Sequence, residues 1–238
     1  MIHMSLPTVS FFTTCWEKDW RVILLDPDYL RLRQIGNHCF PFSEKILVIN
    51  NVDDLAAVKK AAQEKVDEGV LTRYVVADEA ILPAFQLNRA EFPSDWLYYN
   101  AIGPLTAIHG CQSDYLLYLT GDVRLDASLD WIRPSLRWME KDPKIKVANP
   151  TWNGKYKDAK KESYRTTWNF YQAKEGFSDQ VFLVRTKDFR QPIYWEIRPD
   201  GTHYPHGDTF EKRVFSYMKN REWERITFRR GSYIHENI

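Results

Sequence analysis

The sequence is poor in cysteine and has no long apolar segment. Its 238 residues include three cysteines, which are widely spaced and odd in number. This pattern argues against a disulfide framework and favours a reducing compartment, so we expect a cytoplasmic protein. No apolar run approaches the roughly 18 residues of a membrane span, and the first residues lack the features of a secretory signal. We therefore expect no transmembrane segment, while peripheral contact with a membrane stays open.

The chain also lacks an excess of charge of either sign. Its formal net charge is +1, so electrostatics gives no argument for a nucleic-acid partner. No Gly/Ser-rich linker, repeat or low-complexity tract divides the chain, which favours a single domain over residues 1–238. Aromatic residues, by contrast, make up 15% of the chain and include nine tryptophans. Aromatic side chains fill cores, and they also stack on sugars and bases in binding sites.

Hydrophobic patterning in the first half alternates between strands and helices. A helix capped by Asp53 or Asp54 and ended by Gly69 separates two apolar strands, at 45–50 and 73–77. A strand, helix, strand unit with a right-handed crossover makes a parallel sheet. The expected fold class is therefore α/β, with a central, mostly parallel sheet flanked by helices. Further strands are expected at 8–14, 115–119, 146–148, 180–184, 225–228 and 232–234, and further helices at 95–110 (broken or restarted at Gly103 and Pro104), 128–139 and 208–219.

The strongest functional signal is the carboxylate of Asp122. An apolar strand over 115–119 ends abruptly in Thr120, Gly121 and Asp122. In open α/β sheets, ligands bind beyond the carboxyl ends of the strands. A carboxylate there, beside a nucleotide diphosphate, is suited to anchoring a hard divalent cation. The polar, aromatic and basic stretch 151–176 then reads as a long functional loop or lid that could stack on an acceptor sugar.

The order of these signals over residues 8–235 resembles the GT-A glycosyltransferases, and within them the family-2-like enzymes. Asn100 and Gly103 match an Asn-x-x-Gly element before the metal strand, and Asp122 matches the last position of the DxD motif, whose first Asp is replaced by Thr120. The segments that carry the rest of the resemblance are Phe12-Thr-Thr-Cys-Trp16, Ile49-Asn-Asn-Val-Asp-Asp54, His206-Gly-Asp-Thr-Phe-Glu-Lys-Arg213 and Tyr233-Ile-His-Glu236.

The resemblance implies a single GT-A domain, with a nucleotide-sugar-binding half at 1–125 and an acceptor-binding half at 126–238. It implies transfer of a sugar from a UDP- or GDP-sugar to a glycan or other hydroxyl acceptor, in carbohydrate biosynthesis, with Mn²⁺ or Mg²⁺ held by Asp122 and His235. Asp208 is the expected general base of an inverting reaction, with Asp179 as the rival base or an acceptor contact. The expected donor contacts are Thr13, Thr14, Asn51, Asp78, Asn100 and Asp122.

Structural interpretations of these residues stay open beside the functional ones. Asp208 and Glu211 also fit a capping box at a helix start, Asp122 could cap its own loop, and His235 could be a packed histidine. His203 and His206, with Asp208, do not fit the usual spacing of a zinc site.

Two other functions also stay open. A sugar-phosphate nucleotidyltransferase would carry a glycine-rich loop after the first strand, but residues 13–16 contain no glycine. A degenerate domain that binds glycans or partners without catalysis is supported by the missing first Asp of the motif.

Overall fold

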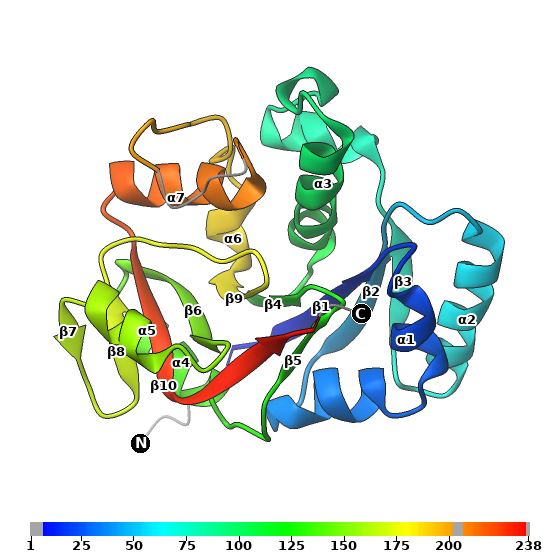
Figure 1. The fold of residues 1–238 in the computed structure, drawn as a ribbon, viewed down its shortest axis with the longest axis horizontal. Helices are drawn as coiled ribbons and strands as arrows, with labels where there is room; N and C mark the ends of the chain where they lie inside the picture. The colour runs from blue at the N-terminus through cyan, green and yellow to red at the C-terminus, as the bar shows by residue number, and fades with distance from the viewer. Residues whose placement is uncertain (1–6, 202–206, 237–238) are drawn as a thin grey trace.

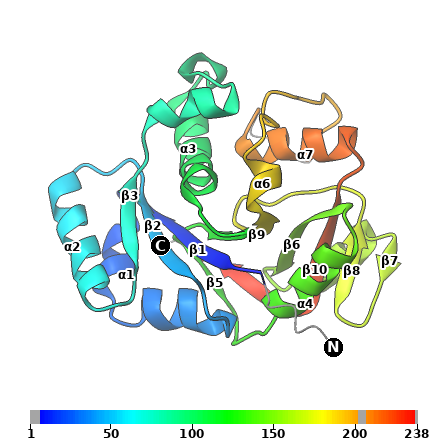
Figure 2. The same cartoon turned by 180° about the vertical axis from the view of Figure 1, so that it is seen from behind.

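The computed structural model describes residues 7–201 and 207–236. One ten-stranded sheet runs through these residues in the order β3-β2-β1-β4-β9-β6-β10-β8-β7, and β5 pairs with β10 beside this path. Figures 1 and 2 show the sheet between helices, with α3, α6 and α7 above it in both views. The expected α/β class, with a central, mostly parallel sheet flanked by helices, is confirmed.

The first four strands of the chain are mutually parallel. They are β1 (Val9–Cys15), β2 (Glu44–Ile49), β3 (Arg73–Val76) and β4 (Tyr115–Leu119), with β1 between β2 and β4. Every residue of β4 is buried, as its continuous apolar sequence predicts for a central strand. Because the strands are parallel, their carboxyl ends meet at one edge, where the predicted donor residues follow them.

The second half of the chain completes the same sheet. β9 (Val181–Arg185) lies antiparallel between β4 and β6 (Ile145–Trp152), and β6 runs parallel to β10 (Glu224–His235). The outer strands are β5 (Val123–Leu125), β7 (Arg165–Thr166) and β8 (Phe170–Ala173). β10 forms a single strand where two separate strands were expected, and it shifts register against β6. After these shifts, the end of β10 pairs with β5, which follows β4 in the chain.

Alternating side chains divide the core between the two faces of the sheet. Phe12, Leu116 and Val184 pack beneath α3 and α7 on one face, whereas Phe11 and Leu117 point to the other face, which α4 covers. The helices are α1 (Trp20–Leu25), η1 (Tyr29–Ile35), η2 (Gly36–His38), α2 (Leu55–Asp67), η3 (Glu79–Phe85), η4 (Arg89–Glu91), α3 (Asp95–Gly110), α4 (Ile132–Lys141), α5 (Tyr156–Glu162), α6 (Thr186–Phe189) and α7 (Phe210–Asn220). None of the helices in the described ranges combines the length and the apolar character that crossing a membrane requires.

Three expectations about the helices and the lid were wrong. α3 continues through Gly103 and Pro104 because its residues from Ala101 to Ile108 are buried, and this packing offsets the hydrogen bond that proline removes. α4 begins at Ile132, four residues later than expected. Residues 151–176 are not one long loop, since they contain the end of β6, α5, β7 and β8.

Candidate active site at the carboxyl ends of the strands

Asp122 and His235 meet at the end of β4. Asp122 lies in the turn between β4 and β5, and His235 ends β10, which pairs with β5. The Nε2 atom of His235 lies 2.7 Å from Oδ2 of Asp122, and both side chains are partly exposed. The hydrogen bond to Asp122 raises the pKa of His235, and Gln180 contacts the other ring nitrogen at 2.9 Å. The two residues predicted to bind a metal are therefore adjacent, although they lie more than 100 positions apart in the sequence.

Side chains of η1 hydrogen-bond the backbone of the turn that carries Asp122. The buried side chain of Gln34 donates to the carbonyls of Thr120, Gly121 and Val123 at 3.2, 2.9 and 2.9 Å. The hydroxyl of Tyr29 also donates to the Gly121 carbonyl, at 2.9 Å. These bonds fix the backbone on both sides of Asp122, so its carboxylate is positioned by the fold.

A second carboxylate lies close to this turn. Asp19 is 2% exposed and accepts a hydrogen bond from the backbone N–H of Trp16 at 2.8 Å. Burial, and then the charge of Asp122, raise the pKa of Asp19 to about 7. Within residues 7–201 and 207–236, however, no group of three or more His, Cys, Asp or Glu side chains is arranged to hold a metal ion.

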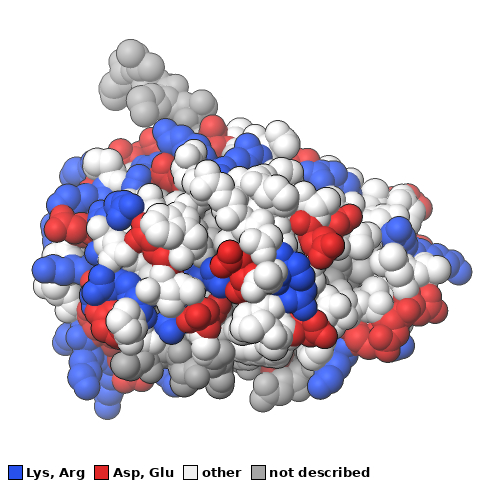
Figure 3. All heavy atoms as spheres, turned by 90° about the horizontal axis from the view of Figure 1, so that it is seen from above, with Lys and Arg blue, Asp and Glu red and all other residues white. Residues whose placement is uncertain are grey.

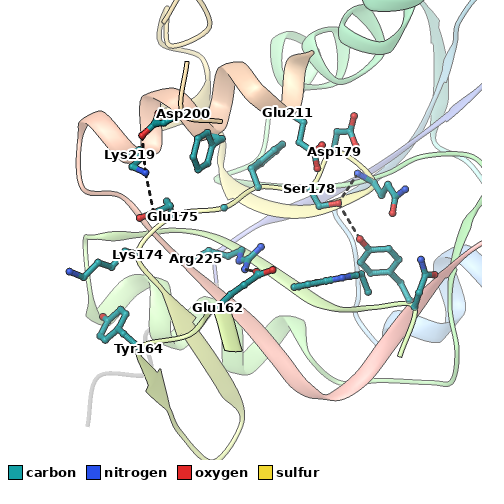
Figure 4. A pocket seen from close by; sticks show the side chains of 17 residues that line it. Glu162, Tyr164, Lys174, Glu175, Ser178, Asp179, Asp200, Glu211, Lys219 and Arg225 are labelled. Atoms are coloured by element: carbon teal, nitrogen blue, oxygen red, sulfur yellow. Dashed lines mark hydrogen bonds and ion pairs between the residues drawn. The ribbon is translucent and has the colours of Figure 1, made fainter. Parts of the chain in front are cut away.

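A cavity of about 900 Å³, whose lining residues Figure 4 shows, includes two residues that contact His235. Gln180 and Asn153 line it and also contact His235, through the Gln180 side chain and through the bond from the His235 backbone N–H to Asn153 Oδ1. The other described residues that line it are Trp152, Glu162, Tyr164, Lys174, Glu175, Gly176, Phe177, Ser178, Asp179, Asp200, Glu211, Phe215, Lys219, Arg225 and Tyr233.

Two carboxylates face each other at the end of the cavity nearest to His235. Asp179 precedes β9 and Glu211 lies in the first turn of α7, and Figure 4 shows their carboxylates side by side. Burial removes water from Asp179 and raises its pKa to about 6. Hydrogen bonds from its own backbone and from the Asn100 side chain act in the opposite direction and lower the pKa. Burial and then the charge of Asp179 raise the pKa of Glu211 well above its usual range. We call Asp179 and Glu211 the carboxylate pair. It holds a proton more readily than two separate carboxylates would.

The predicted donor contacts are divided between this site and the neighbouring strand ends. Asn100 lowers the pKa of Asp179 and so lies close to it, and the side chains of Thr14 and Tyr118 both lie next to Gly103. Thr13 is fully buried, and its hydroxyl has no hydrogen-bond partner in the part of the chain that the structure describes. Asn51 and Asp78 are exposed beyond the ends of β2 and β3. Asn51 has a left-handed backbone with φ of 49°, and Asp78 caps η3 through the N–H of Ala80 at 2.9 Å.

Asp208 is not among the described residues that line this cavity. It pairs with Lys212 at 2.9 Å, and its side chain is 42% exposed. The alternative of a capping box at Asp208 is not formed, since Thr209 caps α7 by accepting the N–H of Lys212. His203 and His206 lie outside the described residues.

Sequence analysis missed several residues that the fold brings to the site. Glu211 was considered only as part of a helix cap, and its place in the first turn of an expected helix was the one available signal. Asp19, Gln180 and Arg225 gave no signal because each depends on contacts between distant segments. Arg225, for example, is 4% exposed and donates to Glu162 at 2.8 Å, across 63 positions of sequence.

Comparison with known proteins shows which fold places these residues together. No protein-family model matches the sequence, and a search of curated proteins finds no match. Among solved structures, a mannosyltransferase from Pyrobaculum calidifontis in complex with GDP-Man and Mn²⁺ matches 97% of this chain with a TM-score of 0.57 and 11% identity. GalNAc-T7 with UDP, GalNAc and Mn²⁺ matches 98% with a TM-score of 0.58 and 12% identity. The chain has the GT-A glycosyltransferase fold.

The match covers only part of each of these two GT-A structures. The chain covers 57% of the mannosyltransferase chain and 44% of the GalNAc-T7 chain, so it spans about half the length of the structures that it matches. The predicted resemblance is thus confirmed at the level of the GT-A fold. The narrower likeness to family-2-like enzymes, and the division into halves at residue 125, stay predictions.

The donor atoms at the Asp122 turn fit a divalent cation. One carboxylate oxygen and one imidazole nitrogen lie 2.7 Å apart, and Gln180, which lines the cavity, contacts the same imidazole ring. Mg²⁺ is usually held by one or two carboxylates together with substrate phosphates and water, and mixed oxygen and nitrogen ligands suit Mn²⁺. Two protein ligands therefore suffice only where a phosphate-bearing substrate supplies the others.

Proposed function

We propose that this protein is a metal-dependent glycosyltransferase, which moves a sugar from a UDP- or GDP-sugar to a hydroxyl acceptor with inversion at the anomeric carbon. The observation that carries the proposal is the meeting of Asp122 and His235 beside a cavity that ends in two carboxylates. Support also comes from the solved neighbours, which were seen with nucleotide or nucleotide sugar and Mn²⁺.

In the proposed site, the donor lies across the carboxyl ends of β1 to β4. Asp122 and His235 would hold Mn²⁺ or Mg²⁺, which when bound neutralises the diphosphate leaving group as a Lewis acid. The buried clamp from Gln34 and Tyr29 keeps Asp122 in place, so little reorganisation is needed when the donor binds. Thr13, Thr14, Asn51, Asp78 and Asn100 stay proposed donor contacts.

We place the general base at the carboxylate pair and not at Asp208. A base must lie within hydrogen-bond reach of the acceptor hydroxyl, and the pair faces the cavity whereas Asp208 is paired with Lys212. The pKa of Asp179, about 6, also lies nearer to neutral pH than that of an ordinary carboxyl group, which strengthens the base.

The reaction at this site consists of one displacement. The acceptor oxygen forms a bond to the anomeric carbon as the bond from that carbon to the nucleotide diphosphate breaks, and the hydroxyl proton passes to the carboxylate pair. Attack from the side opposite the leaving group gives inversion. In the proposed arrangement, the acceptor lies in the cavity on the side of the carboxylate pair, and the leaving group lies at the Asp122 turn.

The test is calorimetric titration of the protein with UDP and with GDP, each with and without Mn²⁺. Binding of one nucleotide that requires Mn²⁺ is expected, and Asp122→Asn should remove the Mn²⁺-dependent part while the fold is retained. In a transfer assay, Glu211→Gln should lower turnover by on the order of 10²-fold or more without weakening nucleotide binding. Lys187→Ala, on an exposed residue of α6, is the control for both measurements. If neither nucleotide binds, the result would instead favour a degenerate domain.

A further inference from the structure

The cavity extends well beyond the carboxylate pair. Its volume of about 900 Å³ lies near the upper end of the ~300–1,000 Å³ range of small-molecule sites. Figure 4 shows Asp179 and Glu211 at one end, Arg225 and Glu162 in the middle, and Tyr164 and Lys174 at the other end. A single sugar ring whose hydroxyl reaches the carboxylate pair would leave the middle and far parts of the cavity unfilled.

Arg225 marks the middle of the cavity as a binding surface. Its side chain is almost fully buried and pairs with Glu162 at 2.8 Å, and its Nε atom has no hydrogen-bond partner among the described residues. Leaving a buried N–H without an acceptor is costly, and Arg225 lines the cavity, where a ligand can approach its guanidinium. Gly176, with φ of 108°, lets the chain close on the guanidinium, because a Cβ there would lie 3.1 Å from Nη1.

The charges of the cavity disfavour an anionic ligand. Among the described lining residues, three cations stand against five carboxylates, which are Glu162, Glu175, Asp179, Asp200 and Glu211. Arg225 is paired with Glu162, and Lys219 lies 3.2 Å from Asp200 and 3.7 Å from Glu175. The positive charge is thus largely neutralised within the cavity, whereas carboxylates remain to accept hydrogen bonds from hydroxyl groups.

Aromatic rings complete the cavity. The Tyr164 side chain is 53% exposed at the end away from the carboxylate pair and is held by a 2.8 Å hydrogen bond to Glu224. The Arg225 guanidinium lies over the Trp152 ring, 5.4 Å from its centroid. Aromatic faces beside carboxylates and an arginine suit ligands with apolar ring faces and many hydroxyls.

We propose that this cavity binds the acceptor and that the acceptor is an uncharged oligosaccharide of at least two rings. One hydroxyl of its terminal ring reaches the carboxylate pair, and the next ring lies against Arg225, Glu162 and Tyr164. This inference rests on the proposed function and narrows its acceptor from any hydroxyl compound to one class. Acidic oligosaccharides and hydroxyl-bearing peptides are the alternatives that the test must separate.

The test is saturation-transfer NMR and calorimetry on the full chain with Mn²⁺ and the nucleotide that binds. The probes are uncharged di- and trisaccharides (malto-, cello-, manno- and chito-series), an oligogalacturonide and a serine-containing peptide. Trisaccharides of one uncharged series should bind, more tightly than the matching monosaccharide. Tyr164→Ala should weaken that binding by on the order of tenfold, equivalent to about 1.4 kcal/mol.

Matched variants separate a binding role from a structural one. Trp168→Ala removes another exposed aromatic ring, 78% exposed, from the same segment of the chain but outside the cavity lining, and it should leave saccharide binding unchanged. Glu162→Gln keeps the shape of a half-exposed side chain and should weaken saccharide binding without changing nucleotide binding. Arg225→Lys should also weaken saccharide binding without changing nucleotide binding. If this variant fails to fold, Tyr164→Ala and Glu162→Gln, at more exposed positions, still test the proposal.

The outcomes distinguish this inference from the function on which it rests. Nucleotide binding together with binding of only the oligogalacturonide or only the peptide would overturn the acceptor class and leave the transferase intact. If Tyr164→Ala and Glu162→Gln bind the saccharide as tightly as the unaltered protein, the proposed acceptor site is likewise overturned and the proposed transferase is left intact. Saccharide binding without nucleotide binding would support the cavity as a glycan-binding site and would contradict the proposed transferase function. Binding of neither would overturn both.

Discussion

The carboxylates of this site differ in what surrounds them, and that decides their chemistry. Asp122 lies in an exposed turn beside His235, where a charged carboxylate can meet a cation. Asp179 and Glu211 lie together in a cavity wall, where loss of water and mutual repulsion favour a shared proton. Asp208 faces Lys212 and solvent. These four carboxylates thus lie in three different environments.

The raised pKa values of the carboxylate pair have a consequence for stability. A carboxyl group whose pKa is higher in the folded than in the unfolded state keeps its proton on folding, so stability is greatest at low pH and falls as pH rises between the two values. For Asp179 this window runs from about 4 to about 6. We expect Asp179→Asn to flatten the decline of Tm across this window, as measured by thermal unfolding at a series of pH values.

The control for this pH series is Asp208→Asn, whose carboxylate lies outside the cavity lining. It should keep the slope of the unaltered protein. An unchanged slope in Asp179→Asn would show that the pair is solvated in solution and would weaken its assignment as the base.

At the scale of elements, the metal turn depends on close packing between segments that are far apart in the sequence. Gly121 is surrounded by β1, α1 and Asp19. A Cβ at this position would lie 2.3 Å from the Thr14 carbonyl oxygen and 2.4 Å from a methyl group of Ile23. The first of these atoms belongs to a sheet backbone and cannot move aside. The η1 clamp from Gln34 and Tyr29 closes the turn from the other side.

Gly121→Ala should therefore destabilise the protein and weaken Mn²⁺-dependent nucleotide binding. Overpacking of this kind costs roughly 1–3 kcal/mol, which denaturant unfolding will measure. Gly110→Ala is the matched control, because a Cβ at that end of α3 meets nothing within 4 Å. A Gly121→Ala protein as stable as the control would mean that the turn can shift, and that Asp122 is less rigidly placed than the structure indicates.

At the scale of the whole molecule, the two ends of the chain share one sheet. β9 lies between β4 and β6, and β10 pairs with β5 at the Asp122 turn. On the face that carries α3 and α7, the described basic and acidic side chains are interspersed, so they present no field of one sign (Figure 3). Specific contacts within the cavity, rather than long-range attraction, would then select the ligands on this side.

This shared sheet predicts that residues 1–125 do not fold alone. Without β9, the buried strand β4 would expose an apolar edge, and β5 would lose β10 as its partner. The fragment should lack a cooperative unfolding transition and should bind no nucleotide, as followed by circular dichroism and calorimetry. A soluble fragment with a sharp transition would establish the first half as an independent domain.

The sequence by itself determined the order and most of the positions of the strands and helices. Apolar runs and helical periodicity are local properties, so β4, α2 and the carboxylate at Asp122 were predicted from neighbouring residues alone. The family resemblance, and no local pattern, joined His235 to Asp122, and the tertiary structure alone brought Glu211 to Asp179, because the sheet is built from both halves of the chain. Glu211 in the first turn of α7 lines the cavity, whereas Asp208 lies outside the lining formed by the described residues, and no local pattern could predict that difference. Burial in a shared cavity then set the pKa values of the carboxylate pair.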